Sequence, residues 1–205
     1  MTTRTAATSP RARPMSPHER RASIIDAVMP LLVENGRDVT SKQIAEAAGV
    51  AEGTIFRAFG DKESLIEAAI AKFLDPEPLR RGLRAIPSEL PLDDKVMRIV
   101  ELMLERFSEI FRVMAAIGGT RPPKHSHRHI LAAIISDVLS PQLDELKWSP
   151  ERTAHVIRLV TFSASFPQLN EGTEFTPREL AEIILYGIAG KPAATRPTTT
   201  TESQD

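Results

Sequence analysis

The apolar positions of this chain recur at intervals of three and four residues, which is the period of an amphipathic helix. The period is clearest over residues 17–36, over residues 92–117 and over residues 150–166. No segment alternates apolar and polar residues as a half-buried strand would. The pattern therefore predicts an all-α protein of about nine helices.

The first predicted helix carries clear boundary residues. Ser16 and Glu19 have the spacing of a capping box, and Gly36 is placed to end the helix. Pro30 interrupts it and predicts a kink, because proline removes one backbone hydrogen bond. The predicted buried stripe consists of Ile24, Ala27, Val28 and Leu31.

Two short helices joined by a tight turn are predicted for residues 40–59, TSKQIAEAAGVAEGTIFRAF. Gly49 can adopt the positive φ that ends the first of them. In the second helix, Ile55 and Phe59 are four residues apart and face the core. Their spacing leaves Thr54 and Arg57 pointing outward. Such a helix-turn-helix lays its second helix in the major groove of DNA.

A longer pattern of spaced residues surrounds this motif. It consists of Thr40, Ile44-Ala45, Ala48-Gly49-Val50, Gly53-Thr54, Ile55-Phe56, Phe59, Lys62-Glu63 and Leu65. In order and spacing it closely resembles the N-terminal domain of TetR-type (TetR/AcrR) transcriptional regulators, over roughly residues 17–75. The resemblance implies an N-terminal three-helix DNA-binding domain and a helical domain for effector binding and dimerisation. Proteins of this type are homodimers whose small-molecule effector releases them from DNA.

The resemblance also implies which residues contact DNA. They are Thr40, Ser41, Lys42, Glu52, Gly53, Thr54, Phe56, Arg57 and Lys62. Phe56 stands where many relatives carry tyrosine, so one hydroxyl contact with a phosphate is lost. Ala51 replaces the usual serine cap of the recognition helix, which weakens that helix start. Glu52 either favours the positive helix end or accepts a hydrogen bond from a cytosine amino group.

Composition shifts divide the chain into four parts. Residues 1–15 are predicted to be a disordered basic arm, and residues 191–205 a disordered tail. Prolines after residue 75 separate the DNA-binding domain, residues 16–75, from the helical second domain, residues 76–190. The first 21 residues hold five arginines and one glutamate. Because the whole chain has a formal net charge of −1, the arginine-rich front (+4) leaves −5 on the remainder.

Dimerisation is expected because one recognition helix reads too few bases for useful specificity. By resemblance, the dimer helices are about residues 150–166 and 177–189, the second ending at Gly190. Their candidate interface residues are Val156, Leu159, Val160, Ser163, Leu180, Ile183, Ile184 and Gly187. Packing in the protein's own core is the alternative for many of them.

An effector pocket is expected among the helices of the second domain. Its candidate lining residues are Met103, Arg106, Phe107, Phe111, Met114 and Phe162, with Met97 as a further methionine. Arg106 could meet an anionic group. Ordinary core packing is the alternative for the methionines and phenylalanines.

Other classes of function are disfavoured. The chain has no cysteine, and His125, His127 and His129 lie in a predicted loop without acidic neighbours, so we expect no metal site and no cofactor. No apolar run reaches the length of a membrane span and no leader is apparent, which predicts a cytoplasmic protein. No nucleophile elbow or phosphate-binding loop indicates an enzyme. An enzyme or a helical adaptor that does not bind DNA is the alternative reading.

Overall fold

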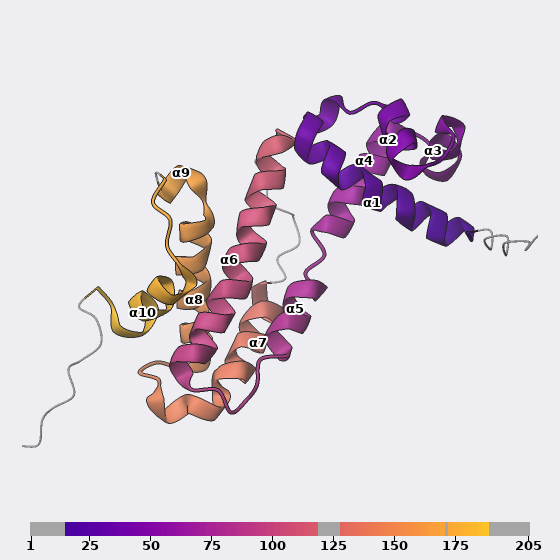
Figure 1. Cartoon of the computed structure of the whole chain (residues 1–205). Helices are drawn as coiled ribbons and strands as arrows, with labels where there is room; N and C mark the ends of the chain where they lie inside the picture. The colour runs from indigo at the N-terminus through magenta and orange to yellow at the C-terminus, as the bar shows by residue number, and fades with distance from the viewer. Residues whose placement is uncertain (1–14, 119–127, 171, 189–205) are drawn as a thin grey trace, which may run out of the picture. The chain divides into compact units, whose positions relative to one another are not determined.

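The computed structural model describes residues 15–118, 128–170 and 172–188 (Figure 1). Within these ranges it consists of helices and connecting segments, without a strand, which confirms the predicted all-α class. The elements are α1 Pro17–Asn35, η1 Gly36–Asp38, α2 Ser41–Ala48, α3 Glu52–Phe59, α4 Lys62–Phe73, α5 Glu77–Arg84, α6 Leu92–Ala116, α7 Arg128–Leu139, η2 Ser140–Glu145, α8 Pro150–Ser165, α9 Pro167–Asn170 and α10 Pro177–Tyr186, where η marks a 3₁₀ helix.

The chain forms two compact units. Among the described residues, the first contains residues 15–75 together with 115–118, which include the last two residues of α6. The second contains residues 76–114, 128–170 and 172–188. The helix α6 therefore contributes residues to both units.

In the first unit, α1 packs against α2 and α4. Its capping box is present, because Ser16 Oγ accepts from the amide of Glu19 and Glu19 Oε2 accepts from the amide of Ser16. The helix continues through the exposed Pro30 to its end at Asn35. The fully buried residues of α1 are Ile24, Val28 and Leu32, whereas Ala27 and Leu31 of the predicted stripe are only half-buried.

Gly36 follows α1 with a φ of +59°. A Cβ atom at this position would lie 2.8 Å from the carbonyl oxygen of Ala116, which is closer than real Cβ contacts. Both the backbone conformation and the close approach therefore require glycine here. Ile117, the residue that follows Ala116, is buried.

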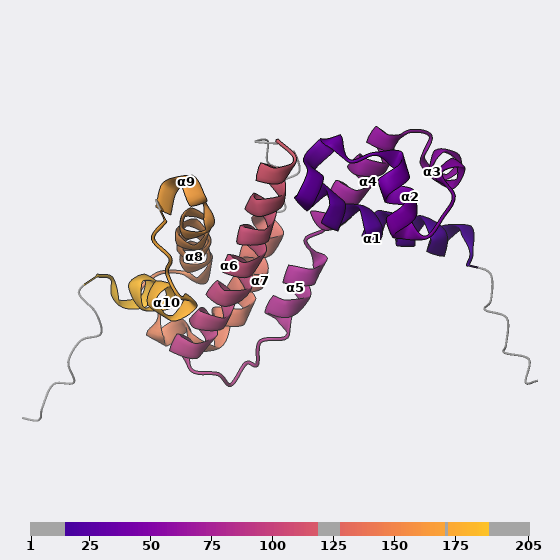
Figure 2. The ribbon, with the colours of Figure 1, turned by 45° about the horizontal axis from the view of Figure 1, so that its top comes forward.

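The second unit is built around α6 (Figure 2). Its core side chains come mainly from α6, α7, α8 and α10, and α7 packs both on α5 and on α8. The core residues are Leu83, Ile86, Leu92, Val96, Ile99, Val100, Met103, Ile134, Ile135, Leu139, Ala154, Ile157, Leu180 and Ala181. Within α6 the core positions recur at intervals of three and four residues, which is the helical period.

A lysine is fully buried at one end of this core. Lys95 Nζ donates to the carbonyl oxygen of Ser88 at 2.9 Å and to Oε1 of Gln142 at 2.6 Å. The amide of Gln142 in turn donates to the carbonyl of Leu90 at 3.3 Å. Burial lowers the pKa of Lys95, and the nearby carboxylates of Glu89 and Glu145 oppose that shift. The network ties the start of α6 to η2.

Some predicted boundaries were wrong. The last helix ends at Tyr186, with Gly187 as its C-cap at φ +69°, rather than continuing to residue 189. Gly190, the predicted end, lies outside the described residues, as do the basic arm as far as residue 14 and the tail. The short helix α9 was not predicted.

Candidate DNA-binding surface

The turn between α2 and α3 has the predicted geometry. Gly49 adopts the left-handed conformation, with φ +64° and ψ +34°. Its amide donates to the carbonyl of Glu46 at 3.1 Å, and the amide of Val50 donates to the carbonyl of Ala45 at 3.0 Å. These bonds satisfy the last carbonyls of α2 and set the direction in which α3 begins. A residue with a Cβ would be strained at this position.

The start of α2 is held by a capping box. Thr40 Oγ1 accepts from the amide of Gln43 at 3.2 Å and donates to Gln43 Oε1 at 2.9 Å, while the amide of Thr40 donates to the same Oε1 at 2.8 Å. The hydroxyl of Thr40 is therefore used in holding the helix start. The positions that follow, half-buried Ser41 and exposed Lys42, remain open to solvent at this end of α2.

The recognition helix α3 has a buried side and an exposed side. Ile55 is fully buried and Phe59 is 8% exposed, so both pack in the core of the first unit as predicted. On the other side, Thr54 is half-buried, Arg57 is exposed and Phe56 is 46% exposed. Phe56 and Arg57 are therefore accessible to another molecule.

The start of α3 lacks a side-chain cap, as expected from Ala51. Glu52 and Gly53 follow, both exposed. A Cβ atom on Gly53 would meet nothing within 4 Å, and its φ is not positive. No contact among the described residues thus explains a glycine here, although glycine costs about 0.5–1 kcal/mol relative to alanine inside a helix. Close approach of another backbone to this position would explain it.

Arg21 has a role that the sequence analysis missed. It was counted with the basic front of the chain, but it lies within α1 and binds α3. Its guanidinium donates to the carbonyl oxygen of Ala58 and lies 4.0 Å from the centre of the Phe59 ring. It therefore stabilises the C-terminal end of the recognition helix. A contact between residues 37 positions apart leaves no local trace in the sequence.

Lys62, at the start of α4, has a partner inside the first unit. Its Nζ donates to the carbonyl oxygen of Arg37 at 3.1 Å, and Arg37 pairs with Glu63 at 2.7 Å. The preceding Asp61 caps the helix by accepting from the amide of Ser64 at 2.7 Å, and this bond lowers the pKa of its carboxyl. The ammonium of Lys62 retains two further donors for a phosphate.

The residues predicted to bind an effector are only partly brought together. The ring of Phe162 packs edge-on against Phe107 and Phe111, with centroid distances of 5.5 and 5.1 Å, and Phe111 also contacts Phe166 at 4.8 Å. Met103 is instead fully buried in the core, while Phe162 is 42% exposed. Arg106 pairs with Glu109 at 3.5 Å, and Met114 is half-buried on the last turns of α6.

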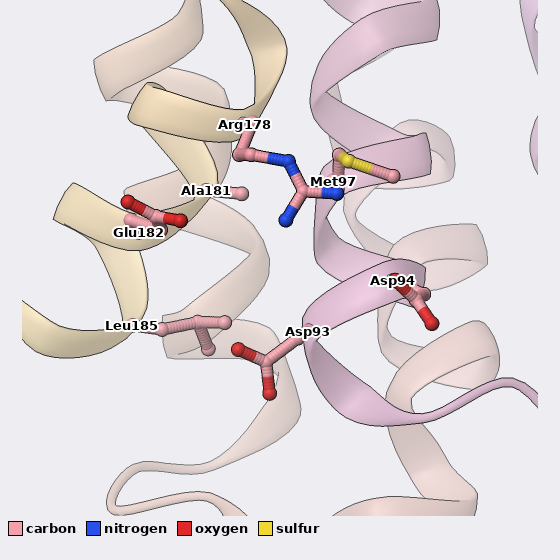
Figure 3. Close-up of a pocket in the computed structure, with 7 residues that line it drawn as sticks. All are labelled: Asp93, Asp94, Met97, Arg178, Ala181, Glu182 and Leu185. Carbon is pink, nitrogen blue, oxygen red and sulfur yellow. The ribbon is translucent and has the colours of Figure 1, made fainter. Parts of the chain in front are cut away.

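Two hollows lie elsewhere in the second unit. The smaller one, with a volume of about 30 Å³, lies between α6 and α10. Figure 3 shows its lining, in which Arg178 of α10 extends toward Met97 of α6. The other, of about 280 Å³, is a groove between α5, the following loop and α7. None of the six predicted effector residues lines either hollow, although Met97 lines the smaller one.

The predicted dimer residues fall into three groups. Leu159, Ser163 and Gly187 are exposed, and Leu159 is 54% exposed. Leu180 is buried in the core of its own unit, which is the alternative role considered for these positions. The half-buried residues are Val156, Val160, Ile183 and Ile184.

Two further observations concern other classes of site. Among the residues that the structure describes, no group of three or more histidine or acidic side chains is arranged to hold a metal ion. His125 and His127 lie outside these residues. No helix in the described part of the chain is long and apolar enough to cross a membrane.

The class of protein follows from this fold and from comparison with known proteins. The family profile described as "Bacterial regulatory proteins, tetR family" matches residues 24–69, which span α2 and α3. The chain is 30% identical over 161 residues to an HTH-type transcriptional repressor of Mycobacterium tuberculosis, covering 78% of this chain and 79% of that protein. It is also 30% identical over 175 residues to the HTH-type transcriptional regulator BetI of Escherichia coli, covering 83% and 76%. The chain therefore belongs to the TetR family and is a transcriptional regulator.

Solved structures agree on the fold. A TetR-family transcriptional regulator from Streptomyces coelicolor aligns with a TM-score of 0.54 at 21% identity, over 83% of this chain and 79% of that one. A TetR-like transcriptional regulator from Rhodococcus aligns with a TM-score of 0.51 at 18% identity, over 90% of this chain and 100% of that one. The fold that these proteins share with this chain thus includes the helical second unit as well as the helix-turn-helix.

Proposed function

We propose that this regulator represses transcription by binding a near-palindromic operator as a homodimer, with α3 of each subunit in the major groove. The observation that carries the proposal is the turn at Gly49, which buries Ile55 and Phe59 and leaves Phe56 and Arg57 exposed on α3. That division of the helix gives the first unit a rigid scaffold and an outward surface of the size that a groove admits.

In this proposal the contacts divide into two kinds. The start of α2, with Ser41 and Lys42, and the start of α4, with Lys62, bind phosphates on either side of the groove. On α3, Gly53 lets the backbone approach the duplex, while Thr54 and Phe56 provide hydroxyl and apolar contacts. Thr40 acts by holding the start of α2, since its hydroxyl is already bonded to Gln43.

Dimerisation is assigned to α8 and α10 of the second unit. The support is an apolar surface on α8 formed by Leu159 and Phe162, which are 54% and 42% exposed. Small or polar neighbours, Ser163 and Gly187, are exposed beside these helices and would permit close approach of a second copy. We accordingly assign residues 16–75 to DNA binding and residues 76–190 to dimerisation and effector binding.

Release is assigned to a small-molecule effector that binds the second unit and prefers a state that does not fit the operator. The proposal includes no catalytic reaction, no cofactor and no metal, and it places the protein in the cytoplasm with its DNA.

The proposal is tested by footprinting the purified full-length chain on the DNA that flanks its own gene. We expect protection of a near-palindrome and an affinity that falls steeply with salt. Leu159→Asp should make the protein monomeric and weaken operator binding, while the matched exposed substitution Glu151→Gln at the start of α8 should change neither. Absence of any protected site at low salt, or full operator affinity in a monomer, would contradict the proposal.

A further inference from the structure

Arg80, in the middle of α5, is a buried cation with unused hydrogen-bonding capacity. The residue is 8% exposed, and its Nη1 donates to Glu77 Oε1 at 3.0 Å. Its other two nitrogens, Nε and Nη2, are shielded from solvent and meet no acceptor among the described residues. The guanidinium is therefore satisfied at one corner only.

The two unused nitrogens form one edge of the planar guanidinium. Their N–H groups point in parallel from that edge, with the spacing that two oxygens of a carboxylate or phosphate require. Burying charged donors without acceptors costs more than about 1–3 kcal/mol for each group. Glu77 occupies the Nη1 corner of Arg80, and among the described residues the Nε–Nη2 edge is left open to a further acceptor.

A place for the rest of such a molecule lies next along the helix. Arg84, four residues after Arg80 and on the same side of α5, lines the groove of about 280 Å³ between α5 and α7. Glu77 joins the two arginines, because its Oε2 lies 3.6 Å from Nη1 of Arg84. The groove is otherwise lined by apolar Ile86, Ile134, Val138 and Pro141 and by polar Ser88 and Asp137, while Arg80 lies beside it rather than in its lining.

The opposite helix, α7, also has a buried polar atom without a partner. The hydroxyl of Ser136 is buried and forms no hydrogen bond. Since α5 packs on α7, two helices in direct contact each carry polar groups that the fold leaves unsatisfied. Within the described residues, no other buried side chain is left in this condition. The unsatisfied groups are thus concentrated on the pair of helices that forms the groove.

We propose that the Nε–Nη2 edge of Arg80 binds the anionic group of the effector, whose apolar body lies in the groove between α5 and α7. The effector is accordingly an organic anion, a carboxylate or a phosphate ester with an apolar chain or ring. This inference rests on the proposed function only for the statement that the bound anion releases DNA.

Binding at Arg80 has a conformational requirement. Because both nitrogens are shielded and α5 packs on α7, we place the opening between these two helices: the anion binds the state in which α5 has shifted on α7 and draws the population toward it. Only residues 74–76 separate α5 from α4 of the first unit. A shift of α5 therefore acts on the chain directly beside the DNA-binding unit.

The first test observes Arg80 in the full-length wild-type protein by ¹H–¹⁵N NMR of arginine Nε groups. The probes are octanoate, octyl phosphate and neutral octan-1-ol, and Arg80→Lys identifies the resonance by its loss. We expect a saturable shift of the Arg80 resonance with octanoate or octyl phosphate and none with octan-1-ol. Whichever of the two anions binds with the higher affinity shows whether the natural ligand is a carboxylate or a phosphate ester.

The second test measures octanoate and octyl phosphate affinity by calorimetry in variants. Arg80→Gln should weaken binding of the preferred anion about tenfold or more, which corresponds to 1.4 kcal/mol. Arg80→Lys keeps the positive charge but loses the pair of parallel N–H donors, so this variant should also bind the anion more weakly. The control is Arg81→Gln, an exposed arginine on the same helix, which should bind as the wild type does.

Three results would overturn the assignment: no saturable binding of either anion to the wild type, equal binding of octan-1-ol, or equal losses in Arg80→Gln and Arg81→Gln. If Arg80→Gln fails to fold, the Arg80→Lys variant and the wild-type NMR titration decide. Anion binding at Arg80 that leaves operator DNA bound would support this site and count against effector release in the proposed function. If the ligand-free protein does not bind operator DNA, the DNA-binding proposal is contradicted and the anion site at Arg80 is not.

Discussion

The guanidinium of Arg21 lies 4.0 Å from the centre of the Phe59 ring and donates to the carbonyl oxygen of Ala58. One side chain of α1 thus covers the last buried residue of α3 and satisfies one of the carbonyls that a helix end leaves without a partner. The orientation of the recognition helix therefore depends on a residue outside the helix-turn-helix.

Substituting this residue should affect both stability and DNA binding. We expect Arg21→Met to destabilise the first unit by about 1–2 kcal/mol, from the lost cation–π contact and helix-end interaction. Operator affinity should fall as well, because α3 is less firmly oriented. Chemical denaturation and operator titration measure the two effects. The neighbouring Arg20→Met serves as control, since the exposed Arg20 bonds to the carbonyl of Met15 in its own helix start and not to α3.

Gly53→Ala should separate folding from binding. Because a Cβ at this position meets nothing within 4 Å, the folded protein should be as stable as the wild type or more stable by up to about 1 kcal/mol. Operator affinity should nevertheless fall, because the methyl group obstructs approach of the DNA backbone. Thermal unfolding and a binding titration provide the comparison. Unchanged operator affinity would remove Gly53 from the DNA contact surface.

Arg57→Ala should weaken binding by about the same factor on operator and on scrambled duplexes, because we assign the exposed side chain to a phosphate. The slope of log affinity against log salt should become shallower by about 0.9, the change expected for one phosphate contact. Titrations at several salt concentrations on both duplexes test this. A loss confined to the operator would instead assign Arg57 to a base.

The free energy of unfolding should decrease in acid, because three carboxylates that cap helices become protonated. Hydrogen bonds from the backbone of Ser16, Ser64 and Thr176 lower the pKa values of Glu19, Asp61 and Glu179 below the ordinary values of 4.5 for Glu and 3.8 for Asp. A carboxyl whose folded pKa is lowered contributes stability above its unfolded pKa and loses it as the pH falls through the folded pKa.

The melting temperature should therefore be flat near neutral pH and fall below about pH 4.5. Glu19→Gln should reduce the steepness of that fall, because glutamine can form the same capping bond at every pH. Melting curves recorded across this range would detect the difference. A variant with an unaltered acid dependence would show that the Glu19 cap contributes nothing to it.

The parts of this structure that sequence predicted best are those specified by neighbouring residues. The turn at Gly49 and the cap at Ser16 depend on residues within four positions of one another, so their chemistry is visible in the sequence. Helical periodicity located Ile24 and Val28 in the core for the same reason, although it preferred Leu31 to Leu32.

What sequence did not predict depends on packing between distant residues. The partner of Arg21 is fixed only when α1 lies on α3, and the unsatisfied edge of Arg80 is known only once its surroundings are built. The predicted effector residues were chosen as apolar positions at helical spacing. That criterion did not separate Met103 of the core from Phe162 at the surface, nor identify the groove beside Arg84.

The close approach of Ala116 to Gly36 bears on how this protein can be divided. Expression of the N-terminal segment alone, cut after Asp75, would remove Ala116, whose carbonyl oxygen lies close to Gly36, together with the buried Ile117 of the same unit. The resulting fragment would lack part of its hydrophobic core. A low DNA affinity of this fragment would therefore say little about the affinity of the full-length protein.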